Sequence, residues 1–109
     1  MSLEMKVIFD EGEDKWIFSP SGEIDIYSSQ EFKEGILEKF NTKKTDILID
    51  GEKLEYIDST GLGALIYILK LLKDDDFKIH LMNIKPNIKK LFNITELDKL
   101  FLIRGGKDD

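Results

Sequence analysis

The sequence predicts an α/β fold in which helices pack against a mostly parallel β-sheet that opens with an N-terminal hairpin. Three observations lead to this class. Two apolar, strand-like segments separated by a polar turn come first. Helical and strand patterns then alternate along the chain, as expected when helices connect parallel strands. The run 46–50 is short and almost wholly apolar, which is typical of a central strand covered on both faces. The expected order is strand, strand, helix, strand, helix, strand, helix, strand.

The opening hairpin is expected over residues 5–9 and 15–18, because both segments are apolar and flank the polar turn 10–14. Its second strand is expected to end at 19–22, since Pro20 has no backbone N–H to donate. Residues 1–4 are interpreted as a cloning remnant or a disordered start, and 105–109 as a flexible tail. The whole chain, 1–109, is expected to form a single domain.

The first helix is expected to begin near Ser28, because residues 28–31 have the spacing of a capping box. Helical periodicity places four apolar side chains on its inward face. These are Phe32, Ile36, Leu37 and Phe40. The second helix is expected from about Thr60 to Lys73, with a core stripe and an additional apolar flank. The stripe comprises Leu62, Leu65, Ile66, Leu69 and Leu72. The flank comprises Ala64, Ile68 and Leu71, and burial, a partner and a dimer contact are all open for it.

The C-terminal part predicts a strand over 77–82, then a third helix whose first turn contains Pro86. Ile88, Leu91 and Phe92 are expected to face inward. Residues 95–98 resemble a capped start, so a short helical turn should precede a last strand near 100–103.

Composition excludes several classes of function. The net charge of −6 argues against nucleic-acid binding, which needs clustered Lys and Arg. The absence of cysteine excludes disulfides and thiolate metal sites. No apolar run approaches the roughly 20 residues of a membrane span, so a cytoplasmic location without membrane contact is expected. A serine nucleophile needs an oriented base, and the only histidine, His80, lies mid-strand, where a histidine is more often a packed or surface residue than a catalyst. We therefore expect no enzyme activity, catalytic residue, metal or cofactor.

The most informative segment is 56–66, where a short apolar strand is joined to the long second helix. Asp58, Ser59 and Thr60 are preferred residue types for capping the free N–H groups at a helix start. The same helix end favours a phosphate, so Ser59 is interpreted as a phosphorylation site. Simple N-capping is the alternative. Gly61 and Gly63 are poor helix formers, and both close approach of another backbone and helix–sheet packing explain them.

Several motifs together resemble the STAS domain, in particular the single-domain anti-sigma factor antagonists of bacteria. They are Gly-Glu-Ile-Asp at 22–25, the apolar strand ending at Asp50, Tyr-Ile-Asp-Ser-Thr-Gly-Leu-Gly at 56–63, the Pro86–Phe92 helix and Thr-Glu-Leu at 95–97. The resemblance covers nearly the whole chain. It implies the STAS fold.

The resemblance also implies a function. Ser59 would be phosphorylated by a cognate anti-sigma factor that is itself a serine kinase. The unphosphorylated protein would bind this kinase and free a sigma factor, phosphorylation would end binding, and a PP2C-type phosphatase would restore it. Asp58, Ser59, Thr60, Gly61 and Leu62 would form the partner-binding site, with Asp25 nearby. A phosphorylation-independent STAS scaffold or adaptor in a signalling or transport complex is the alternative, and a weak homodimer is left open.

Two departures from the family pattern stand out. Gly51 follows the strand-end Asp50, where many relatives have leucine, and it is expected to loosen the loop. Asp76 and Phe77 replace a glycine pair after the second helix. Asp75 or Asp76 must then adopt the left-handed conformation that ends the helix, which aspartate tolerates better than most residues.

Overall fold

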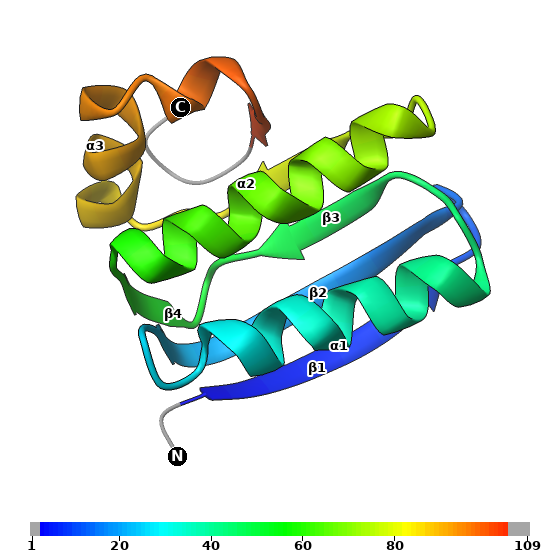
Figure 1. Cartoon of the computed structure of the whole chain (residues 1–109), viewed down its shortest axis with the longest axis horizontal. Helices are drawn as coiled ribbons and strands as arrows, with labels where there is room; N and C mark the ends of the chain where they lie inside the picture. The colour runs from blue at the N-terminus through cyan, green and yellow to red at the C-terminus, as the bar shows by residue number, and fades with distance from the viewer. Residues whose placement is uncertain (1–2, 105–109) are drawn as a thin grey trace.

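The computed structural model describes residues 3–104 and has the predicted α/β architecture (Figure 1). The elements are β1 (Leu3–Asp10), β2 (Lys15–Ile24), α1 (Ser29–Thr42), β3 (Ile47–Asp50), β4 (Leu54–Ile57), α2 (Ser59–Asp74), β5 (Ile79–Met82), α3 (Pro86–Ile94), a 3-10 turn (Leu97–Lys99) and β6 (Leu102–Arg104). The sheet order is β1-β2-β3-β5-β6, with β4 paired to β2. Only β1 and β2 are antiparallel, and the other pairs are parallel. The prediction of a mostly parallel sheet with an N-terminal hairpin is confirmed.

Helices α1 and α2 lie side by side across one face of the sheet, and the core fills the space between the layers (Figure 1). The predicted inward face of α1 is largely right, because Phe32, Ile36 and Phe40 are buried while Leu37 is partly exposed. In α3, Ile88 and Phe92 are buried as predicted. The hydrophobic periodicity of these two helices was therefore sufficient to orient them.

The apolar stripe of α2 is broader than predicted and includes most of the flank. Ala64 and Ile68 are buried within the chain, which answers the question that the sequence left open for them. Ile66, predicted to be core, is only partly buried, and Leu71 is 37% exposed. Because α2 packs on the sheet and also against α1, it buries a wider arc of its surface than one stripe.

Strand β2 does not end at Pro20, contrary to prediction, but continues to Ile24. Residues up to Phe18 pair with β3, and pairing with β4 begins at Gly22. Pro20 lies in the gap between these two partners, where the missing N–H breaks no ladder hydrogen bond. One long strand can therefore support both β3 and β4.

The predicted order counted one strand between the first two helices, whereas the structure has two, β3 and β4. Strand β4 is the short apolar strand that was expected directly before Asp58. The N-terminal boundary was also wrong. Strand β1 begins at Leu3, which is buried, so Leu3 and Glu4 belong to the sheet. Gly51 does not loosen its loop: it is buried, and a Cβ there would lie 2.6 Å from Cδ1 of Ile84, whose side chain fills the space.

The C-terminal turns lie where the sequence predicted them, but the predicted residue does not cap the short turn. Asp76 has φ 65°, as predicted for the residue that ends α2. Thr95 does not cap the short turn, because its hydroxyl donates to the carbonyl of Leu91 at 2.9 Å and Glu96 takes the cap position. Residues 105–109, predicted to be a tail, lie outside the described residues.

Candidate functional site

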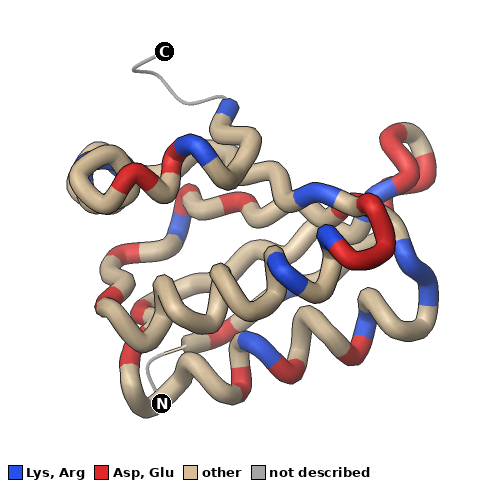
Figure 2. Tube along the Cα trace, turned by 45° about the horizontal axis from the view of Figure 1, so that its top comes forward, with Lys and Arg blue, Asp and Glu red and all other residues tan. Residues whose placement is uncertain are grey.

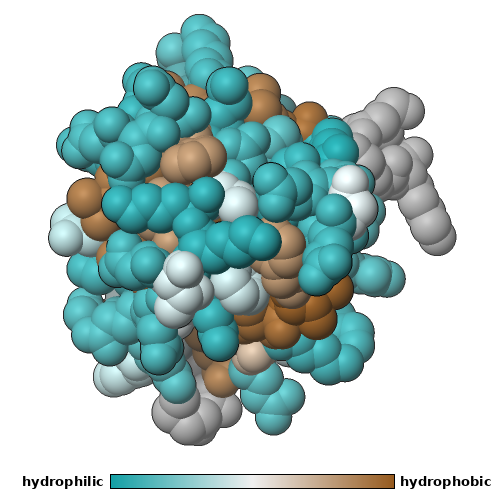
Figure 3. Space-filling view, turned by 90° about the vertical axis from the view of Figure 1, so that its right-hand side faces the viewer, coloured by the Kyte–Doolittle hydropathy of each residue, from teal (hydrophilic) through white to brown (hydrophobic). Residues whose placement is uncertain are grey.

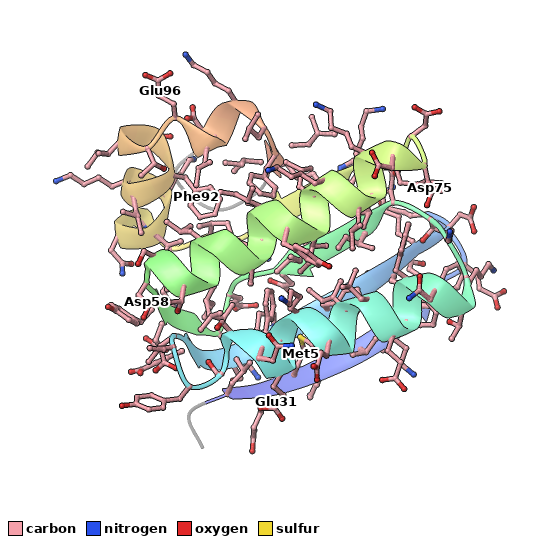
Figure 4. The ribbon with its side chains drawn as sticks, in the orientation of Figure 1. Met5, Glu31, Asp58, Asp75, Phe92 and Glu96 are labelled. Carbon is pink, nitrogen blue, oxygen red and sulfur yellow. The ribbon has the colours of Figure 1, made fainter. Side chains whose placement is uncertain are left out.

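Two loops meet at one end of the sheet, on the left in Figure 1. One joins β2 to α1, and the other joins β4 to α2. Strands β2 and β4 run parallel up to the pair Ile24 and Ile57, and the amide of Asp58 donates to the carbonyl of Ile24 at 3.2 Å. The predicted site residues Asp25 and Asp58 therefore lie at the same end of the sheet, and Figure 4 labels Asp58 at the start of α2.

Asp58 is the N-cap of α2. Its backbone is extended, and its Oδ1 accepts hydrogen bonds from the amides of Thr60 at 2.9 Å and Gly61 at 3.0 Å. The Thr60 hydroxyl donates to the same oxygen at 2.5 Å. This hydroxyl and the Gly61 amide hold the pKa of the Asp58 carboxyl below its ordinary value. Desolvation opposes them less strongly, and the amides of Thr60 and Ile26 lower the pKa further. Asp58 is therefore an ionised cap.

The two neighbouring hydroxyls differ in availability. Thr60 is engaged with Asp58, whereas the Ser59 hydroxyl has no hydrogen-bond partner within residues 3–104. Ser59 is also exposed, as the first helical residue of α2. A free, exposed oxygen at a helix N-terminus can accept a phosphoryl group that the adjacent N–H groups and the helix dipole stabilise. Of the two hydroxyls, this geometry favours Ser59.

Gly61 and Leu62 have structural positions within this motif. A Cβ on Gly61 would lie 2.7 Å from the carbonyl oxygen of Ile24 and 2.6 Å from Cγ1 of Ile57. Glycine is thus needed for the close approach of α2 to the ends of β2 and β4. Leu62 is buried in the core. These two residues fix the start of α2 rather than offering a surface.

Gly63 has a different environment, although the sequence treated both glycines alike. It is exposed, and a Cβ added there would meet nothing within 4 Å. Helix–sheet packing therefore explains Gly61 but not Gly63. One turn from Ser59, Gly63 leaves a bare stretch of backbone on the outside of α2.

Asp25 lies at the same end of the sheet, but its carboxylate accepts hydrogen bonds from amides of its own loop. Oδ1 accepts hydrogen bonds from the amides of Tyr27 at 3.0 Å and Ser28 at 3.1 Å. The hydroxyl of Ser28, which is buried, accepts from the Asp25 amide at 3.0 Å and donates to the carbonyl of Glu23 at 2.8 Å. The predicted capping box at Ser28 is wrong, since this side chain makes no cap hydrogen bond to α1. The hydroxyl closes the loop instead.

This closed loop presents large apolar side chains to solvent. Ile26 is 66% exposed and Tyr27 88% exposed, and Tyr56 on neighbouring β4 is 48% exposed. Ile26 was not singled out from the sequence, although a large apolar residue between a strand end and a helix cap has little chance of burial. We call Ile26, Tyr27, Tyr56 and Ser59 the apolar rim.

The opposite end of the sheet has a different character. The acidic turns 10–14 and 74–76 both lie there (Figure 2), and its surface is mainly hydrophilic with separate apolar areas (Figure 3). His80 lies in β5 with its Nε2 3.0 Å from Oδ2 of Asp46, away from Ser59. Among residues 3–104 no three His, Asp or Glu side chains gather as a metal site, and no helix is long and apolar enough to cross a membrane.

Comparison with known proteins identifies the family. The model of the STAS domain matches residues 6–108. This chain belongs to the STAS domain family. An anti-sigma-B factor antagonist of Staphylococcus aureus is 32% identical over 87 residues, which span 80% of this STAS domain and 81% of the relative.

Solved structures share the fold. An anti-sigma factor antagonist from Mycobacterium paratuberculosis superposes with a TM-score of 0.84 at 24% identity, covering 99% of this STAS domain and 90% of that chain. The Bacillus cell fate determinant SpoIIAA, solved in its phosphorylated form, gives a TM-score of 0.69 at 20% identity, covering 94% and 91%. The architecture is thus that of the STAS fold, as the sequence motifs implied.

Proposed function

We propose that this STAS domain is an anti-sigma factor antagonist that binds a partner serine kinase through the apolar rim and is switched off by phosphorylation of Ser59. The observation that carries the proposal is the contrast between two adjacent hydroxyls. Ser59 is exposed and free of hydrogen bonds within the described chain, whereas Thr60 is held by Asp58. The S. aureus relative, named an anti-sigma-B factor antagonist, supports the same class of function.

The apolar rim has exposed side chains that are typical of protein-binding surfaces. Exposed tyrosines provide large contact areas, and aromatic side chains often contribute most of the binding energy at protein interfaces. Ile26 and Tyr27 follow the end of β2, and Tyr56 lies two residues before the N-cap of α2, so these exposed side chains and Ser59 belong to the same end of the sheet. The kinase in that complex would then hold Ser59 beside its nucleotide. Asp58 and Thr60 would lie at the centre of the interface, and Asp25 would hold the loop beneath Tyr27.

Phosphorylation would act on the interface and leave the fold intact. The Ser59 Oγ attacks the γ-phosphorus of ATP on the kinase, the bond to the ADP leaving group breaks, and the hydroxyl proton passes to a base of the kinase. The product carries about −1.5 to −2 charges at neutral pH. The N-terminus of α2 stabilises this group in the free protein. Against a partner surface, the group adds bulk and a desolvated charge beside the ionised Asp58, and binding is lost until a PP2C-type phosphatase removes it.

The proposal is tested with the purified protein, an anti-sigma factor kinase of the host and Mg-ATP. Peptide mass spectrometry should locate phosphate on Ser59 in the wild type and in Thr60→Ala, and none in Ser59→Ala. Ser59→Asp should bind the kinase at least a hundredfold more weakly than the wild type, which corresponds to about 2.7 kcal/mol. Binding of Ser59→Asp with wild-type affinity would exclude the switch and favour the phosphorylation-independent adaptor. Phosphate on Thr60 in place of Ser59 would show that Thr60 is the phosphorylation site.

The docking surface needs a separate measurement. Tyr27→Ala removes the most exposed rim side chain while leaving the amide that Asp25 binds, so the loop should persist. Kinase affinity should fall about tenfold or more, as expected of an aromatic residue in an interface. Ile8→Ala is the matched control, because Ile8 is 59% exposed on β1 outside the rim. Equal effects of the two substitutions would argue against the rim as the docking surface.

A further inference from the structure

The outer edge of β1 is a long, unpaired strand edge. Strand β1 ends the sheet, runs for eight residues and pairs only with β2 among the described strands. It lies along the lower margin of the sheet in Figure 1, with α1 on one face. The other described strands with a single partner, β4 and β6, have only four and three residues. An exposed strand edge of this length is a template for a further strand.

The register of the hairpin shows which backbone groups face outward. The amide of Gly22 donates to the carbonyl of Lys53, so the even-numbered residues of β2 direct their backbone groups away from β1. The β1–β2 register is continuous, so the odd-numbered residues of β2 bond to Glu4, Lys6, Ile8 and Asp10. The amides and carbonyls of Leu3, Met5, Val7 and Phe9 therefore point outward, without a partner strand in residues 3–104.

A second copy of the chain could pair antiparallel to this edge in four symmetric registers that pair at least five residues of each strand. Centring on Lys6 would place the two Lys6 side chains opposite each other. Centring on Val7 would place Glu4 opposite Asp10 of the second copy. Like charges directly opposite destabilise strand pairs, and opposite charges stabilise them.

The other two registers are complementary in charge. Centring on Met5 places Glu4 of each copy opposite Lys6 of the other, and centring on Ile8 places Lys6 opposite Asp10. The groove beside β1 is lined by Leu3, Met5 and Val7, which are the residues paired in the Met5 register, and it therefore favours that register.

We propose that two copies associate through β1 in the Met5-centred register and form one continuous sheet across a two-fold axis. Leu3 and Val7 of each copy would exchange hydrogen bonds with Val7 and Leu3 of the other, and the two Met5 residues would bond to each other. A groove of about 250 Å³ beside β1 supports this arrangement, since Met5 lines it with Gly35 of α1 and the second copy would close it. The interaction uses backbone groups of β1, whereas the proposed kinase contact uses the residues of the apolar rim, so the two contacts share no residue.

The absence of cysteine allows a register-specific test. Met5→Cys, Lys6→Cys, Val7→Cys and Ile8→Cys each place a cysteine on the two-fold axis of one register only, where the Cα atoms come within disulfide reach. Under glutathione oxidation at high protein concentration, Met5→Cys should form covalent dimers at least tenfold faster than the other three. Lys6 and Ile8 are exposed whereas Met5 is only partly exposed, so simple accessibility would instead favour Lys6→Cys and Ile8→Cys. Faster cross-linking of any of the other three variants, or equal rates, would overturn the proposal.

Charge exchange provides a second measurement without cysteine. Lys6→Glu places glutamates opposite each other in the Met5 register, so the dimer dissociation constant from sedimentation equilibrium should rise about fivefold or more. The double variant Glu4→Lys with Lys6→Glu restores the opposite charges and should return it to the wild-type value. Both residues are exposed, so neither change should disturb folding, which circular dichroism checks. Failure of the double variant to recover dimerisation, or a monomeric wild type at millimolar concentration, would contradict the pairing.

Discussion

The two helices that cover the sheet both begin beside an aspartate and a serine, yet the two serines have opposite environments. At the start of α1, Ser28 is buried and hydrogen-bonded, and with Asp25 it closes the loop. At the start of α2, the Asp58 carboxylate caps the helix alone and Ser59 is exposed. A serine three residues after its aspartate folds back onto the strand end, whereas a serine directly after it faces solvent. Spacing, more than residue type, separates a structural hydroxyl from one available for modification.

The exposed position of Ser59 depends on the close packing of α2 against the ends of β2 and β4, and Gly61→Ala should disrupt this packing. The new Cβ would overlap the backbone of Ile24 and the side chain of Ile57, and neither the carbonyl nor the buried side chain has room to move. We expect a loss of about 3 kcal/mol in the free energy of unfolding, typical of severe overpacking. Urea denaturation measures it. A loss below about 0.5 kcal/mol would show that the junction between β4 and α2 yields easily.

Ser28→Ala and Ser59→Ala test the contrast between the two serines directly. Removing the Ser28 hydroxyl leaves the Asp25 amide and the Glu23 carbonyl without a partner in a partly buried loop. We expect this to destabilise the protein by about 2 kcal/mol. Ser59→Ala removes a hydroxyl that has no partner within the described chain, and its effect should stay within about 0.5 kcal/mol. Similar losses for both variants in the same denaturation assay would remove the distinction.

Local patterns predicted most of this fold, and the failures occurred where a residue's environment is set by residues far along the chain. The inward faces of α1 and α3, the helix start at Pro86 and the left-handed Asp76 depend on neighbouring residues, so periodicity and turn chemistry identified them. Pro20 was misinterpreted because its tolerance depends on a gap between two strands far along the chain. Gly51 was misinterpreted because Ile84 fills the space beside it.

The candidate site likewise contains residues that local patterns identified and residues whose environment depends on packing. The sequence identified Asp58, Ser59 and Thr60 as a group, because capping chemistry is local. It did not separate Gly61 from Gly63, since only the packing of α2 on Ile24 distinguishes them. It also missed Ile26, whose exposure follows from the closed loop built by Asp25 and Ser28.

The charge of Asp58 should contribute stability with a defined pH dependence. Because the folded-state pKa is lowered, the contribution is fully present above the unfolded-state value, near 3.8, and is lost as the pH falls through the folded-state value. Asp58→Asn keeps a capping oxygen but removes the charge. The melting temperature of the wild type should exceed that of Asp58→Asn at pH 7, and the difference should shrink in acid. A difference that persists unchanged at pH 2 would assign the effect to the hydrogen bonds alone.

Gly63→Ala should have a small effect on stability, with a sign opposite to that of Gly61→Ala. A Cβ at position 63 meets nothing within 4 Å, and alanine is the better helix former, so the protein should gain up to about 1 kcal/mol. If the proposed kinase partner approaches the bare backbone of α2 beside Ser59, the added methyl group should nevertheless weaken binding, by about tenfold or 1.4 kcal/mol. Lys70→Ala, exposed about two turns further along α2, is the control and should leave affinity nearly unchanged. Greater stability together with weaker binding would separate a glycine kept for a partner from one kept for the fold, because no packing defect can produce that combination. Unchanged binding would place the partner's contact on the loops of the apolar rim and not on the helix.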